Sequence, residues 1–336
     1  MEFTTGGRLE IRINSGDVGK RVSIRALNDR TRSPERFTDT VGVLDSWENG
    51  VLCVTRRNGM TVRIAEDAVV AGKVVPMTPA RRRGPAATVR ELQETAARGW
   101  PAVETARLGG WTLRAAGGFT ARANSALPLG DSGLPLPAAL DRVTAWYAER
   151  GLPARVQVTT GDPDADRRLD DELAARGWTE ERHALMRTAA LAPIADVDAA
   201  VDVDAERVLL NREPDDAWLD AYGRTAESVK YEDAARAVLT GGPSVWFARV
   251  PGSAAIGRCV VDGRWAGFAA LEVGPEHRRQ GLATALMARL ARQALDEGAS
   301  AAYLQVERDN AGADALYGRL GFTTHHAYHY RREPGR

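Results

Sequence analysis

The sequence predicts a mixed α+β or α/β protein, with one small all-β domain followed by two similar units of mixed sheet and helix. Three observations support this prediction. Short apolar runs and tight turns fill the N-terminal part, a strand leads through a basic, glycine-bearing turn into a helix near residue 280, and one order of elements occurs twice. Because single cores stop growing at roughly 250–300 residues, a chain of 336 residues is long enough for two or three domains.

Residues 1–78 are expected to form the all-β domain. Asn58-Gly59 lies between two alternating apolar runs, Val51-Leu52-Cys53-Val54 and Thr61-Val62-Arg63-Ile64, and Asn-Gly in that setting is a strong hairpin signal. Several such strands in a short segment suggest a small closed sheet, and the segment resembles an SH3-like barrel. Residues 79–87, with three arginines between prolines, read as a linker.

Residues 88–191 are interpreted as a degenerate copy of the C-terminal unit. The order strand, helix, Gly-aromatic, closing strand occurs in both, with Val156-Gln157-Val158 matching Leu304-Gln305-Val306. Within this copy, alternation predicts that Phe119-Thr120-Ala121-Arg122 is a strand. Pro135 and its neighbours replace the basic turn and remove amide donors, so this copy is not expected to hold a nucleotide.

The most informative stretch runs from Leu271 to Met287. It reads as a strand that ends at Pro275, a basic turn, and a helix whose apolar residues recur with i, i+4 spacing. The first N–H groups of such a helix have no partner inside it, and the helix dipole favours an anion in front of them. Gly281 and Ala283 allow close approach to the main chain. The local chemistry therefore predicts a phosphate or pyrophosphate site.

Two motifs here resemble those of the GNAT N-acetyltransferases. Arg278-x-x-Gly281-x-Ala283 after an apolar strand is similar to the family's acyl-CoA pyrophosphate loop. Asn310-x-x-Ala313-x-x-Leu316-Tyr317-x-x-x-Gly321-Phe322 is similar to a helix that follows the next strand in that family. The matches come in the family's order and imply a catalytic GNAT domain over residues 200–333. The whole arrangement resembles an actinobacterial, histone-acetyltransferase-like group with an SH3-like barrel and tandem GNAT units.

The resemblance implies an acetyl-CoA-dependent N-acetyltransferase in which a primary amine attacks the thioester directly, in a ternary complex. Two neighbouring parallel strands, here residues 267–273 and 302–306, would diverge to admit the pantetheine arm. Main-chain N–H groups of Glu272 or Val273 would then face the thioester carbonyl. The implied cofactor-binding residues are Val273, Arg278, Arg279, Gln280, Gly281, Leu282, Ala283, Thr284 and Asn310.

Acyl transfer from a thioester needs a neutral amine, a stabilised carbonyl oxygen and a proton for the leaving thiolate. The resemblance assigns the proton donor to Tyr317; the alternative is a buried tyrosine with a satisfied hydroxyl. Some relatives have a glutamate as base five residues before the helix asparagine, but that position is Gln305 here. Glu272 is the candidate base, with Glu307, a chain of waters or deprotonation in solvent as alternatives.

The resemblance implies that the segment connecting the first and second strands of the catalytic domain shapes the acceptor pocket. Trp218, Tyr222 and Tyr231 are the candidate contacts, and core packing is the alternative for each. The acceptor amine could belong to a protein, an amino acid, a polyamine or a drug. His325 and His329 share one face of the last strand, but two histidines without a third ligand do not make a zinc site, so no metal is expected.

Composition limits the classes of partner that are expected besides the cofactor and the acceptor. The formal net charge is zero, so nucleic acid is not an expected partner. The two cysteines lie in separate apolar runs, and no segment approaches the roughly 18 apolar residues of a membrane span. We therefore expect a cytoplasmic protein with no membrane partner. Its oligomeric state is open, and the tandem copies could take the place of a dimer.

Two other classes of function compete with the enzyme. The chain could be a non-catalytic acyl-CoA-binding regulator whose barrel recruits a protein or nucleic-acid partner. Asn310 and Tyr317 beside the phosphate loop argue against it, since a sensor needs no positioned acid. The barrel could also be a nucleic-acid module, and a steep salt dependence of binding would support that.

Overall fold

The computed structural model describes residues 11–27, 37–56, 59–75, 84–159, 163–197, 208–222, 232–252 and 254–335. The chain divides into two compact units, Met1–Arg82 and Arg83–Arg336. None of the described helices is long and apolar enough to cross a membrane.

One six-stranded sheet forms the N-terminal unit. Its members are β1 (Ile11–Arg12), β2 (Arg21–Leu27), β3 (Phe37–Glu48), β4 (Val51–Arg56), β5 (Thr61–Ala65) and β6 (Val69–Val74), with 3-10 turns η1 (Ser15–Asp17) and η2 (Glu66–Ala68). The order is β1-β6-β2-β3-β4-β5, and β4 and β5 form the predicted hairpin. Within the described residues β1 and β5 do not pair with each other, so closure into an SH3-like barrel is not observed.

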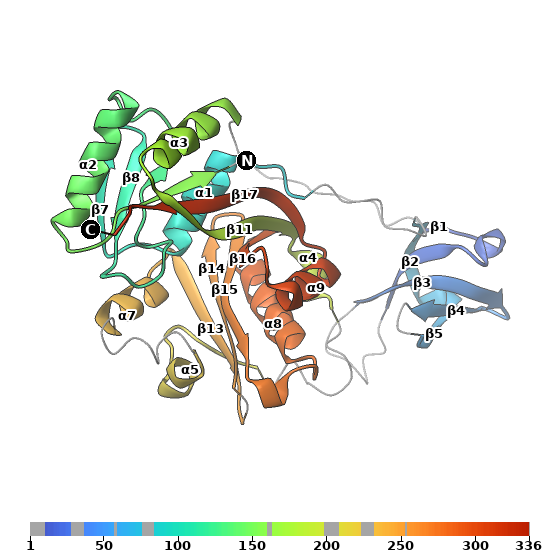
Figure 1. Ribbon diagram of the computed structural model, residues 1–336. Helices are drawn as coiled ribbons and strands as arrows, with labels where there is room; N and C mark the ends of the chain where they lie inside the picture. Colours follow the sequence, from blue (N-terminus) through green and yellow to red (C-terminus); the bar gives the residue numbers. More distant parts are fainter. Residues whose placement is uncertain are drawn as a thin grey trace, which may run out of the picture. The chain divides into compact units, whose positions relative to one another are not determined.

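An eight-stranded sheet is the frame of the second unit. Its strands are β10 (Arg155–Thr159), β11 (Thr179–Ala190), β12 (Leu209–Asn211), β13 (Ser244–Val250), β14 (Ala255–Asp262), β15 (Trp265–Val273), β16 (Ala301–Glu307) and β17 (Thr323–Arg332). The order is β10-β17-β11-β16-β15-β14-β13-β12, and of the described neighbours in this sheet only β15 and β16 are parallel. Figure 1 shows β11 between β17 and β16, so strands from both predicted copies share one sheet.

A smaller three-stranded sheet lies in the first half of this unit. It contains β7 (Glu104–Leu108), β8 (Trp111–Ala115) and β9 (Leu127–Pro128), in the order β7-β8-β9. Trp111 of β8 shares a buried cluster with Leu140 and Leu173, which belong to two helices. The described helices of the unit are α1 (Val89–Gly99), α2 (Leu136–Ala148), α3 (Pro163–Ala175), α4 (Ala192–Ala195), α5 (Asp216–Ala221), α7 (Glu232–Thr240), α8 (Leu282–Asp296) and α9 (Ala311–Arg319), with the 3-10 turn η5 (Pro275–His277).

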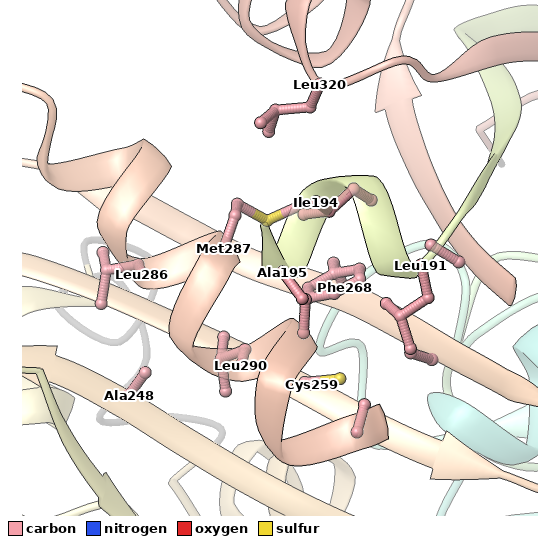
Figure 2. Packing of buried hydrophobic residues seen from close by; sticks show 14 of the residues in the cluster. Leu191, Ile194, Ala195, Ala248, Cys259, Phe268, Leu286, Met287, Leu290 and Leu320 are labelled. Atoms are coloured by element: carbon pink, nitrogen blue, oxygen red, sulfur yellow. The ribbon is translucent and has the colours of Figure 1, made fainter. Parts of the chain in front are cut away.

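The two faces of the large sheet are covered by different helices. Successive residues of a strand point to opposite faces. Leu304 of β16 belongs to the cluster beneath α8. Figure 2 shows Leu290 and Cys259 of the same cluster. The preceding residue, Tyr303, belongs to a second cluster with Leu92 of α1. The sheet is therefore sandwiched between α8 and α1.

The predicted strand at residues 119–122 is wrong. This segment is an irregular loop in which Thr120 has a φ of 59°. The side chain of Asn124 holds it: Oδ1 accepts the N–H groups of Ala116 and Gly118, and Nδ2 donates to the carbonyls of Phe119 and Thr120. A side chain that satisfies these four main-chain groups removes the need for a ladder, so local alternation did not decide the conformation.

Candidate active site

Strands β15 and β16 pair over only part of their length. The parallel ladder ends where Phe268 pairs with Leu304. Beyond that position β15 continues to Val273 and β16 to Glu307 without pairing to each other. The strands therefore separate along the segments predicted to diverge, and a gap opens between them.

A β-bulge in β15 accompanies this separation. The pairs Ile256–Glu272 and Arg258–Ala269 enclose one residue of β14 but two of β15. One of these two, Ala270, has a φ of 50°, a left-handed conformation that costs a residue with a Cβ about 1–2 kcal/mol. Because a bulge bends its strand and increases the local twist, it turns the end of β15 away from β16.

The turn after β15 directs the chain into α8. Arg279 and Gly281 have φ values of 65° and 82°, and Gly281 is the N-cap residue of the helix. No described side chain caps this N-terminus. The first N–H groups of the helix, which follow Gly281, are therefore available at the positive end of a 15-residue helix dipole.

The side chains of this turn differ in whether they line the cavity in front of the helix. Gln280 donates from Nε2 to the carbonyl of Glu276 at 3.2 Å and does not line the cavity in front of the helix. Arg278 donates from Nε to the carbonyl of Val273, also at 3.2 Å, but it lines that cavity together with Arg279. Gln280 thus braces the loop, whereas the arginines give the cavity a positive rim.

The cavity in front of α8 has a volume of about 970 Å³. It is lined by the end of β15 that does not pair with β16, the turn, the first turn of α8 and the start of α9. A second cavity of about 190 Å³ is lined by β15, β16, β17 and the loop at residues 120–122. The two cavities meet at five shared residues, Leu271, Glu272, Asn310, Ala313 and Tyr317.

Tyr317 lies at this junction, on α9, with its ring 5.8 Å from that of Phe322. Burial raises the pKa of Tyr317 to about 12, and the charge of Arg187 opposes that rise. The hydroxyl is therefore protonated at physiological pH. A protonated phenol at a cavity junction can donate a proton or a hydrogen bond to a group that enters the gap.

Two other predicted residues share the junction. Asn310 caps α9, since its Oδ1 accepts the N–H of Ala313 at 3.0 Å. This leaves the side-chain amide nitrogen of Asn310 as the group that can face a ligand. Glu272, near the end of β15, also lines both cavities.

The three aromatic residues predicted to contact the acceptor differ in position. Trp218 is 1% exposed, donates from Nε1 to the carbonyl of Gly257 at 3.3 Å and lines neither cavity. Tyr222 stacks on Trp218 at a centroid distance of 5.4 Å, yet it also lines the small cavity. Tyr231 lies outside the described residues.

Sequence reasoning did not find much of the small cavity's wall. Trp100 and Arg122 come from the first copy, and Tyr328 and Tyr330 come from the last strand. These residues lie in no shared motif, and strand pairing between the copies brings their elements together. Spacing arguments reach only one local motif at a time. The wall residues that sequence reasoning had singled out are Tyr222, Glu272, Gln305, Glu307, Asn310 and Tyr317.

The histidines of β17 divide between two groups. His325 contacts His326, with their Nδ1 atoms 2.9 Å apart. The possible metal-ligand atoms of His329, Glu180 and His183 lie within 4.8 Å of one another. His329 Nε2 is also 3.0 Å from Asp170, and the hydrogen bond from Arg331 keeps the pKa of that aspartate low. Two of the residues that surround this cluster, Asp170 and Arg331, also bond to each other.

A family model described as "Probable histone acetyltransferase Rv0428c C-terminal" matches residues 86–331. The chain belongs to this family. It is 30% identical over 318 residues to the probable histone acetyltransferase Rv0428c of Mycobacterium tuberculosis, with 93% of this chain and 94% of the relative covered. It is 28% identical over 264 residues to the uncharacterized N-acetyltransferase YobR of Bacillus subtilis, with 72% and 98% covered.

Solved structures agree on the fold. A GCN5-related N-acetyltransferase from Kribbella flavida matches with a TM-score of 0.53 at 18% identity, over 75% of this chain and 98% of that one. The protein is therefore an acetyltransferase. Its fold is that of the GCN5-related N-acetyltransferases, as the two motifs predicted. The family match spans both predicted copies and leaves the N-terminal unit outside it.

Proposed function

We propose that this chain transfers an acetyl group from acetyl-CoA to a primary amine by direct attack within a ternary complex. One observation supports this most: the end of β15 that no longer pairs with β16 and the uncapped first turn of α8 line the same cavity. The open edge of a strand offers main-chain groups to an extended pantetheine amide chain, and a helix N-terminus offers N–H groups to a pyrophosphate.

The proposed roles follow from these positions. Main-chain N–H groups of residues 282–284 and the guanidinium groups of Arg278 and Arg279 would bind the pyrophosphate. The end of β15 would hydrogen-bond the thioester carbonyl through the main chain of Glu272 or Val273. Asn310 would donate its side-chain amide to the pantetheine arm.

Proton transfer is proposed to use both sides of the junction. Glu272, which lines both cavities, would accept the proton of the incoming ammonium, directly or through water, with Glu307 as the alternative. Tyr317 would protonate the leaving thiolate, because its raised pKa keeps the phenol in the acid form. For residues 1–78 we retain the SH3-like assignment as part of this proposal.

Thiol release from acetyl-CoA tests the proposed function. The full chain is incubated with acetyl-CoA and with single amines from several classes, including a histone peptide because the Mycobacterium tuberculosis relative is named a probable histone acetyltransferase. Amine-dependent thiol release, with an acetylated product detected by mass spectrometry, is the expected result. Absence of both thiol release and thermal stabilisation by acetyl-CoA would contradict it.

A further inference from the structure

The small cavity contains an arginine that the site described so far does not use. The guanidinium carbon of Arg122 lies 4.5 Å from the ring centroid of Trp100, and its Nη1 donates to Oε1 of Gln305 at 2.8 Å. The loop that positions Arg122 is fixed by the four hydrogen bonds of Asn124. One face and one edge of the guanidinium are therefore held, and Arg122 lines the cavity.

The charge of Arg122 is not balanced by the described part of the chain. None of the ion pairs found there involves Arg122, and its hydrogen-bond partner Gln305 is neutral. Arg258 lies near the same Trp100 ring, 5.1 Å from its centroid, and its side chain bonds only to carbonyls of residues 99, 239 and 241.

A third guanidinium adds to this positive region. Arg114 is 5% exposed, and its side chain donates to Ser125 and Gln157, both uncharged. Burial, and secondarily the positive charge of Arg122, lowers the pKa of both Arg114 and Arg258. The three guanidinium groups are therefore close enough to repel one another. Because burying unpaired like charges is costly, an anion beside Arg122 would stabilise the wall.

A buried phenol lies on the same wall. Tyr330 is 3% exposed and lines the cavity, and its hydroxyl has no hydrogen-bond partner within 3.5 Å in the described chain. Burial raises its pKa, and the neighbouring Tyr328 hydroxyl acts on it only as a donor, which opposes that rise and leaves the Tyr330 proton without an acceptor. The hydroxyl is therefore a proton donor at neutral pH. A buried donor without an acceptor costs about 1–3 kcal/mol. An incoming oxygen could satisfy it, as it could satisfy the remaining N–H groups of Arg122.

Two carboxylates, Glu272 and Glu307, also line the cavity. Glu307 lies 3.6 Å from Arg182, which balances its charge. Glu272 lies at the junction with the larger cavity, where the thioester is expected. The cavity therefore has an anionic group beside the reaction gap and a cationic group on another part of its wall. A ligand with an ammonium and a carboxylate matches that arrangement, whereas a lysine-rich peptide would be repelled by Arg122.

We propose that the acceptor is a small amine that also bears a carboxylate, of the amino-acid class, and that Arg122 and Tyr330 bind this carboxylate. The inference rests on the proposed acetyl transfer. A volume of about 190 Å³ suits an acceptor of that size, since sites for drug-sized ligands occupy about 300–1,000 Å³.

The test compares matched acceptors in the full chain. Each amino acid is assayed beside its methyl ester and its decarboxylated amine, with a basic histone-like peptide as a further arm, and kcat and KM come from thiol release. For the preferred amino acid we expect kcat/KM to exceed that of its ester by about 10- to 100-fold, the range typical of a charged hydrogen bond.

Two variants assign the effect to Arg122. Arg122→Gln is expected to raise KM for the amino acid by about 10- to 100-fold, with kcat and acetyl-CoA stabilisation nearly unchanged, and so to remove the preference over the ester. Gln305→Glu should act in the same direction without removing any group, because its carboxylate would pair with Arg122. Arg142→Gln, on the exposed face of α2, is the matched control and should leave the preference intact.

The outcomes separate the two proposals. Suppose that acetyl-CoA stabilises the protein but that carboxylate-free amines or the basic peptide react as well as amino acids. The acceptor assignment is then overturned and acetyl transfer stands. The same conclusion follows if Arg122→Gln and Gln305→Glu leave the preference for the amino acid over its ester unchanged. If acetyl-CoA binds and no carboxylate-bearing amine reacts, the acceptor assignment alone is overturned. If no amine reacts and acetyl-CoA gives no stabilisation, both proposals are wrong.

Discussion

Phe268 pairs with Leu304 at the last position where β15 and β16 form a ladder. Past this position, the end of β15 shares a cavity with the first turn of α8, and residues of both α9 and β15 connect it to a smaller cavity. Main-chain groups that the ladder leaves unpaired must find partners elsewhere. The break in the ladder thus places hydrogen-bonding main chain next to an anion-binding helix end.

The start of this ladder should tolerate little change at Gly267. A Cβ at Gly267 would lie 2.3 Å from the ring of Tyr303, which packs against α1. Gly267→Ala is therefore expected to lower the free energy of unfolding by about 1–3 kcal/mol, measured by urea denaturation. In the exposed helix α9, a Cβ at Gly318 would have no atom within 4 Å. Gly318→Ala should therefore raise the free energy of unfolding by about 0.5–1 kcal/mol. Equal effects of the two substitutions would argue against close packing at Gly267.

Tyr317→Phe should lower turnover without weakening acetyl-CoA binding. Removal of a general acid typically costs about 100-fold in kcat, because the thiolate must then leave unprotonated or take its proton from water. Since the pKa of Tyr317 is raised to about 12, ionisation of this group should cause no loss of kcat below about pH 10. Steady-state kinetics across pH measure both effects.

Tyr303→Phe is the control for this substitution, because that hydroxyl is buried outside the two cavities, 3.5 Å from the carbonyl of Thr95. It should keep wild-type kcat. Turnover at the wild-type rate in Tyr317→Phe would remove Tyr317 from the chemistry.

The free energy of unfolding should decrease as the pH is lowered, because His326 is buried as a neutral ring. Its Nε2 lies 2.7 Å from Gln93 Nε2, and its Nδ1 lies near His325, so the buried ring needs to be neutral to accept from Gln93. Burial, and secondarily the charge of His325, lower the pKa of His326 to about 4. An unfolded histidine titrates near 6.5, so between these pH values the unfolded chain binds more protons and is favoured as pH falls.

The expected loss is on the order of 3 kcal/mol between about pH 7 and pH 4, measured by urea unfolding at a series of pH values. His326→Gln should flatten this dependence. His183→Gln, at an exposed histidine, should retain it. An identical pH dependence in His326→Gln and the wild type would show that another group is responsible.

Local chemistry in the sequence was enough to predict the strand, turn and helix around Gly281, whereas phosphate binding there stays a prediction. Pro275 ends a strand, Gly281 permits a positive φ, and the apolar spacing that follows defines a helix, so the relevant signals lie within a few residues of each other. The gap between β15 and β16 could be predicted only through the family resemblance. The roles of Tyr317 and Glu272 stay predictions.

The acceptor side could not be predicted in the same way. Arg122 reaches the cavity because Asn124 folds its loop and because β11 joins the C-terminal sheet, and neither effect appears in a spacing pattern. Trp218 and Tyr222 illustrate a second difficulty. Both are aromatic residues of one short segment, yet one is core and the other also lines the cavity, and only tertiary packing separates them.

The central claim is that the N-terminus of α8 binds the pyrophosphate of acetyl-CoA. Gly281→Glu would place a charged side chain at that site, whereas Gly298→Glu places the same side chain, at a similar φ of 89°, just beyond the other end of the same helix. The comparison removes backbone strain as an explanation, since both glycines have a positive φ of similar size.

Thermal unfolding with and without saturating acetyl-CoA measures the difference directly. At a ligand concentration about 100 times Kd, the wild type and Gly298→Glu should gain about 2.7 kcal/mol of stability. The account predicts that Gly281→Glu gains none. Full stabilisation of Gly281→Glu by acetyl-CoA would contradict it.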